Sequence, residues 1–169
     1  MANAEFADAI AVLRAGHRTL ENLFQAFAHA RDRARKARLA RQICTELKIH
    51  TLIEEEVFYP AFSGRIDGVT LAAICAGHDG VMRLVDAIEA GDDGDACEGR
   101  IAALRAEIAP QVKKLERPSN GLFARCRRTG VDLLALRDRL VARRDELAAR
   151  AERDGLPPIR LARPRPIPA

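Results

Sequence analysis

His50 and Glu54 are the pair of residues in this sequence best suited to holding a metal ion. They stand four positions apart in the segment IHTLIEEEVFYP, so in a helix both side chains project from one face, one turn apart. Ile49, Ile53 and Val57 place that face at the edge of an apolar core. A buried carboxylate needs a partner, because leaving it unpaired is costly. Mixed imidazole and carboxylate ligands suit non-haem iron, with zinc or manganese as competitors, and hydrogen-bonded core residues are the alternative interpretation.

Two further histidines lie in a weak internal repeat. GHRTLENLFQAF, starting at Gly16, aligns with GHDGVMRLVDAI, starting at Gly77, at an offset of 61 residues. His17 and His78 follow these glycines and lie on apolar stripes of predicted helices. Each copy is followed by a second helix at a similar distance, which predicts two helical hairpins packed around one interior.

Several other residues near these positions receive less specific interpretations. Glu21, one turn after the first Gly-His, is interpreted as an ion-pair partner or a solvated residue rather than a substitute ligand. Glu55 and Glu56 are expected to face solvent, and Cys75 is expected to be a small buried thiol rather than a soft ligand. The remaining histidine of the chain, His29, is expected to be a partly exposed residue at the end of the first helix.

Helical periodicity and a composition poor in aromatic residues (4%) predict an all-α fold. We expect an up-down four-helix bundle of two helical hairpins, a short fifth C-terminal helix and an extended tail. The bundle is assigned to residues 1–155 and the Pro/Arg-rich tail to residues 156–169. The five helices are expected at about 4–31, 33–58, 69–90, from 96 past Pro110, and 131–151.

The arrangement of His17, the His50-x-x-x-Glu54 pair followed by EEVFYP, and His78 resembles the hemerythrin, or HHE cation-binding, family. The resemblance covers roughly residues 7–147. In that family two hairpins contribute His, His-x-x-x-Glu, His and a final His-x-x-x-Glu or Asp, which hold two bridged irons inside a four-helix bundle. The resemblance therefore implies metal ligation by His17, His50, Glu54 and His78.

The fourth helix departs from the family pattern. Aligning LFARCRRTGVDL with the family's equivalent places Lys114 where the last histidine should be and Pro118 where the last carboxylate should be. Both substitutions remove ligands, so the resemblance implies at most one iron per chain or none. We also expect the Lys114 ammonium to pair with Glu54 in place of the missing metal charge.

The charge of the chain is concentrated at its C-terminus. The net charge is +4, and the last thirteen residues hold three arginines and no acid, which leaves the rest at +1. No nucleic-acid or membrane partner is therefore expected, whereas the basic, proline-rich tail could take a protein partner. The tail is expected to add little to stability, because it lacks a core-facing stripe. Four scattered cysteines and the absence of a secretion pattern or membrane span predict a cytoplasmic protein.

Three classes of function follow from these residues and the resemblance. The leading hypothesis is a mono-iron or metal-poor protein that binds or senses dioxygen, nitric oxide, peroxide or iron. The alternative is a metal-free structural or interaction domain derived from the hemerythrin fold. An enzyme that removes peroxide or nitric oxide ranks last, because no separate acid–base or nucleophile constellation accompanies the candidate ligands.

Overall fold

The computed structural model describes residues 5–91 and 94–161, and in these ranges the chain is helical with no β-strand. The elements are α1 (Ala9–His29), α2 (Arg33–Ile53), the π-helix η1 (Glu54–Phe58), the 3₁₀-helix η2 (Tyr59–Phe62), α3 (Gly68–Glu89), α4 (Asp95–Leu115), α5 (Leu122–Arg127) and α6 (Leu133–Asp154). No helix in the described part of the chain is long and apolar enough to cross a membrane.

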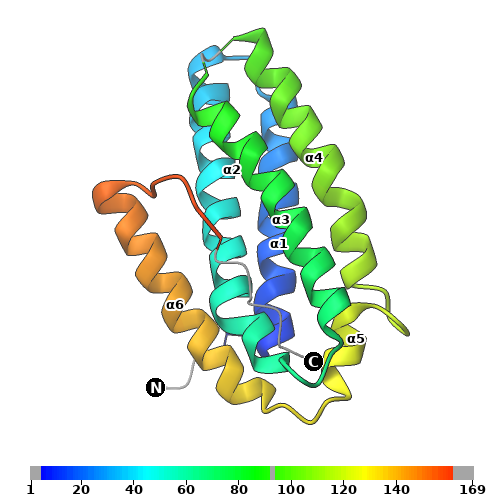
Figure 1. Cartoon of the computed structure of the whole chain (residues 1–169). Coiled ribbons are helices and arrows are strands. Elements are labelled where there is room, and N and C mark those ends of the chain that lie inside the picture. Colours follow the sequence, from blue (N-terminus) through cyan, green and yellow to red (C-terminus); the bar gives the residue numbers. More distant parts are fainter. Residues whose placement is uncertain (1–4, 92–93, 162–169) are drawn as a thin grey trace.

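The first four long helices form an up-down bundle (Figure 1). α1 packs on α2, α3 packs on α4, and α2 contacts α3 across the bundle. This confirms the predicted all-α fold built from two helical hairpins. The fifth long helix is not short, however: α6 has 22 residues, as many as α3, and lies along α1 and α2. The short helix α5 was not expected.

Aspartate residues begin four of the long helices. Asp8, Asp32, Asp67 and Asp132 each precede a helix, and each carboxylate accepts hydrogen bonds from backbone N–H groups of the first turn. These N–H groups have no partner within the helix, so an Asp at this position stabilises the helix start by about 1 kcal/mol. The caps explain why α1 begins later than the expected residue 4.

The apolar core forms two clusters along the bundle axis. One gathers at the end where η1, η2 and α5 lie, and the other near the α1–α2 and α3–α4 turns. α6 adds Leu136, Leu140, Val141 and Leu147 to the first cluster. These residues recur at helical spacing, so α6 buries one stripe and leaves its charged face in solvent.

The first part of the tail packs against the bundle, so the expectation that it buries no apolar surface is wrong for residues 156–161. Leu156, Ile159 and Leu161 are half-buried and contact the two core clusters. Lys48 is 1% exposed, and its ammonium donates to the Leu156 carbonyl at 2.9 Å and to Glu89 at 2.6 Å. The tail thus provides an acceptor for a buried cation on α2. Residues 162–169 lie outside the described residues.

Truncation of the tail tests this contact. Ending the chain after Gly155 should lower the free energy of unfolding by about 2 kcal/mol, because the Lys48 ammonium loses an acceptor and the apolar contacts of Leu156, Ile159 and Leu161 are lost. A chain ending after Leu161 keeps that acceptor and is the matched control. Urea unfolding of both proteins measures the difference. Equal midpoints for the two truncated chains would show that the 156–161 segment adds nothing.

Candidate metal centre

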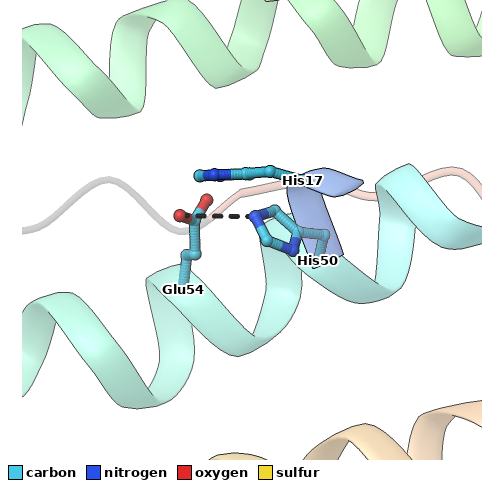
Figure 2. A group of neighbouring side chains, drawn as sticks. All are labelled: His17, His50 and Glu54. Carbon is cyan, nitrogen blue, oxygen red and sulfur yellow. Dashed lines mark ion pairs between the residues drawn. The ribbon is translucent and has the colours of Figure 1, made fainter. Parts of the chain in front are cut away.

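His17, His50 and Glu54 converge from three elements inside the bundle. His17 comes from the middle of α1, His50 from the last turn of α2 and Glu54 from the start of η1. Each offers one ligand atom, and these atoms lie within 4.8 Å of one another. All three residues are buried, and their side chains point toward a common point (Figure 2). The structure therefore brings together three of the four residues predicted as ligands.

His78 reaches the same carboxylate from α3. Its Nε2 lies 3.2 Å from Glu54 Oε2, while His50 Nε2 lies 3.6 Å from Glu54 Oε1. Burial by itself would raise the pKa of Glu54, but His50 and His78 lower it well below its usual value. Glu54 is therefore an ionised carboxylate between two imidazoles. The role of His78 as a metal ligand stays a prediction.

Two further carboxylates orient the histidine rings. Glu116, at the C-terminal end of α4, accepts a hydrogen bond from His17 Nδ1 at 2.6 Å. Glu55 accepts one from His78 Nδ1 at 2.8 Å. A carboxylate on Nδ1 leaves Nε2 as the nitrogen that faces the interior, as in carboxylate–histidine–metal arrangements. The sequence analysis did not identify Glu116, which lies 99 positions from His17 and carries no local signal.

The π-helical turn η1 explains why Glu55 does not face solvent as expected. A π-turn is wider than an α-turn and is often found at functional sites. Here Glu54 and the adjacent Glu55 both reach the histidines, with side-chain exposures of 3% and 8%. Glu56 lies on the outside, as expected, and pairs with Arg143 of α6 at 2.7 Å.

Three buried polar atoms around this cluster have no hydrogen-bond partner among the described residues. They are His50 Nε2, Glu54 Oε1 and the Tyr59 hydroxyl. Buried polar groups are rarely left unpaired, so each such atom calls for a ligand or a water molecule. Burial and the charge of Glu54 raise the pKa of Tyr59 well above its usual value, which keeps its hydroxyl protonated. These atoms and the two-histidine, one-carboxylate donor set fit a bound divalent metal ion.

The contacts of the two repeat glycines show which residues of the two hairpins occupy equivalent positions. Gly16 faces the His50 ring, because a Cβ atom there would lie 2.4 Å from His50 Nδ1. Gly77 faces Gln111 in the same way, with the Gln111 amide oxygen 2.9 Å from its ideal Cβ position. Gln111 lies 61 positions after His50, which is the offset of the repeat. Gln111 therefore stands where the second hairpin would place its histidine.

The predicted alignment of the fourth helix is consequently wrong by three residues. Leu115, not Pro118, lies at the position equivalent to Glu54, and Gln111, not Lys114, at the one equivalent to His50. Pro118 is exposed in the turn after α4. The conclusion that the second hairpin lacks two ligands is unchanged, because neither an amide nor a leucine side chain replaces an imidazole or a carboxylate.

The expected pairing of Lys114 with Glu54 is also wrong. Lys114 is exposed, and within the described ranges its ammonium has no hydrogen bond or ion pair. His78 takes the cationic position instead. Burial would lower the pKa of His78, but Glu54 and Glu55 raise it to about 9.

This shift predicts how the stability of the metal-free protein depends on pH. The pKa of His78 is about 9 in the folded chain and 6.5 as a free side chain. The imidazolium therefore stabilises the fold fully below pH 6.5, and this contribution disappears as the pH rises through 9. The free energy of unfolding should fall by about 3 kcal/mol over this range. Urea unfolding of chelator-treated protein measures it, and a His78→Gln variant with the same slope would contradict the assignment.

The remaining candidates are not part of the three-residue cluster. His29 is exposed, and its Nδ1 hydrogen-bonds the Gln25 carbonyl at 2.7 Å. Glu21 pairs with Arg105 of α4, as the ion-pair interpretation expected. Cys75 is half-buried, and burial and Glu55 raise its pKa to about 11, so it stays a thiol at neutral pH.

Comparison with known proteins identifies the fold family. The family model of the hemerythrin HHE cation-binding domain matches residues 8–126. The chain belongs to the hemerythrin family. The hemerythrin match runs from α1 into α5 and ends before α6, so the closing part of the resemblance, up to residue 147, lies outside it. No curated protein and no solved structure matches the chain.

Proposed function

We propose that His17, His50 and Glu54 bind one non-haem iron ion per chain, and that the protein binds or senses dioxygen, nitric oxide, peroxide or iron itself. The observation that carries the proposal is the pair of unpartnered, buried atoms at this point, His50 Nε2 and Glu54 Oε1. These two atoms face one another at 3.6 Å, beyond hydrogen-bond distance, and a metal ion bound by His17, His50 and Glu54 would give both a partner.

The proposal is limited to one ion because of the second hairpin. At the equivalent positions it offers Gln111 and Leu115. His78 remains, but its two ring nitrogens lie against Glu54 and Glu55. A second cation would have to displace these contacts with few ligands of its own.

The chain's own residues prepare the site for a metal and a small ligand. Burial and the neighbouring His50 lower the pKa of His17, so its imidazole is neutral at pH 7, as a metal ligand must be. Glu116 holds this ring in position through Nδ1. Iron held by two histidines and one carboxylate keeps open positions for a small ligand. The protonated hydroxyl of Tyr59 is a hydrogen-bond donor beside Glu54.

A route for small uncharged molecules reaches His17 between α1 and α4. A cavity of about 230 Å³ there is lined largely by apolar side chains, among them Leu20, Phe24, Ile108 and Val112, with His17 at its wall. The ion pair of Glu21 and Arg105 also lines this cavity. Lys113 lines it as well, so the wall has an apolar part and a charged part.

Metal analysis of protein purified without an affinity tag tests the proposal. We expect up to one iron per chain, and none after replacement of His17 and His50 by glutamine. Two irons per chain, with the absorption of an oxo bridge, would contradict the single site. Protein that takes up no iron, zinc or manganese on anaerobic titration would instead support a metal-free structural domain.

A further inference from the structure

A second cavity lies on the other side of the bundle, between α3, α4 and α5. Its volume of about 470 Å³ is within the range of about 300–1,000 Å³ in which small-molecule pockets lie. Most of its wall is apolar, with Val69, Ile74, Leu115 and Leu122 around the small residue Ala73. Val69 is 82% exposed, the higher exposure of the two large hydrophobic residues that are exposed in the described part of the chain.

One cation on this cavity is uncommitted. Lys114 lines the cavity from the last turn of α4, and among the described residues its ammonium has no partner. Arg125 also lines it, but its guanidinium is bound to Asp67 at 2.7 Å and lies 3.4 Å from the Thr70 hydroxyl. The amides of Gln111 and Asn120 and the Thr70 hydroxyl are neutral polar groups in the wall. The free charge facing this space is therefore positive.

The inner wall of the cavity is His78. The two nitrogens of this ring lie against Glu54 and Glu55, and neither carboxylate is among the residues that line the cavity. An anion entering this space meets Lys114 and no carboxylate. A cation would meet Lys114 and Arg125, and both would repel it.

We propose that this cavity binds a small amphipathic anion, a carboxylate attached to an aliphatic or aromatic body. The body packs against Val69, Ile74 and Leu122, and the carboxylate pairs with Lys114 at the rim. Binding covers the exposed Val69 side chain and supplies Lys114 with a partner. The proposal needs no bound metal ion, because the contacts it invokes are made by Val69, Ile74, Leu122 and Lys114, and none of these is a candidate ligand.

Octanoate is a suitable probe, and the full chain treated with chelator is the sample. Methyl NMR spectra should show saturable shifts at Val69, Ile74 and Leu122 as octanoate is added at pH 7. 1-Octanol, which has the same body without the charge, should bind more weakly.

Two adjacent lysines provide the matched control. Lys113 and Lys114 both lie exposed in the last turn of α4, but Lys113 lines the cavity beside His17 instead. Lys114→Met should weaken octanoate binding about fivefold, the scale of an exposed ion pair, and Lys113→Met should leave it unchanged. Ala73→Phe fills the cavity from an exposed helix position and should abolish binding. Unsaturable or scattered shifts, equal effects of the two lysine variants, or unchanged binding in Ala73→Phe would overturn the proposal.

Discussion

Replacing Glu54 with glutamine should lower the affinity for iron at least about 100-fold, more than the 10–100-fold lost when a residue supporting a ligand is changed. Glu54 is the only carboxylate in the three-residue cluster, and its oxygens lie between His50 and His78. Glutamine keeps the size of the side chain but removes the negative charge that offsets the cation. Anaerobic titration with ferrous iron, followed by metal analysis after gel filtration, measures the loss.

The matched control for this variant is Glu56→Gln, two residues along the same π-turn. Glu56 lies on the outside, where it pairs with Arg143. We expect this variant to keep wild-type iron affinity and to lose little stability, since exposed ion pairs are worth about 1 kcal/mol or less. Equal iron affinities of the Glu54 and Glu56 variants, with both proteins folded by circular dichroism, would place the metal elsewhere or nowhere.

Gly16→Ala should disrupt the candidate centre although it adds a single methyl group. The new Cβ atom would clash with His50 Nδ1 and lie 2.7 Å from its Cε1 atom, so the His50 ring must leave its present position beside Glu54. We expect iron affinity to fall more than tenfold and the free energy of unfolding to drop by about 1–3 kcal/mol, the usual cost of overpacking. Iron titration and urea unfolding measure the two effects.

Two other helical glycines separate this clash from a general effect of the substitution. The position of Gly99 in α4 has nothing within 4 Å of an added Cβ, so Gly99→Ala should stabilise the protein by about 0.5–1 kcal/mol through helix propensity. Gly77→Ala meets the flexible end of Gln111, which can move, so iron binding should persist. If Gly16→Ala behaved like Gly99→Ala, the contact between Gly16 and His50 would not position the ring.

The sequence by itself determined the helical fold and the three candidate ligands that the first hairpin provides. Apolar residues at helical spacing and the i, i+4 placement of His50 and Glu54 are local features, and local geometry follows from them directly. The two Gly-His copies predicted the paired hairpins. The spacing placed His17, His50 and Glu54 on interior faces, and the structure brings their ligand atoms within 4.8 Å. Their role as ligands stays a prediction that the iron titrations test.

The tertiary structure decided the features that depend on how distant segments pack. Sequence alignment placed Lys114 at the position of the last histidine and Pro118 at the position of the last carboxylate. In the structure Gln111 faces Gly77 as His50 faces Gly16, so Gln111 is the counterpart of His50. Residues three or four positions apart lie on nearly the same face of a helix. Periodicity alone therefore cannot decide which of them faces a given partner.

The contacts of Glu116, Glu55 and the tail could not be predicted from the sequence for the same reason. Glu116 meets His17 across 99 positions, and Glu55 turns inward only because a π-turn replaces the expected α-helical turn. Leu156 accepts from the buried Lys48 across 108 positions. Each of these contacts forms only when the helices are docked, because neither partner has a local reason to face the other.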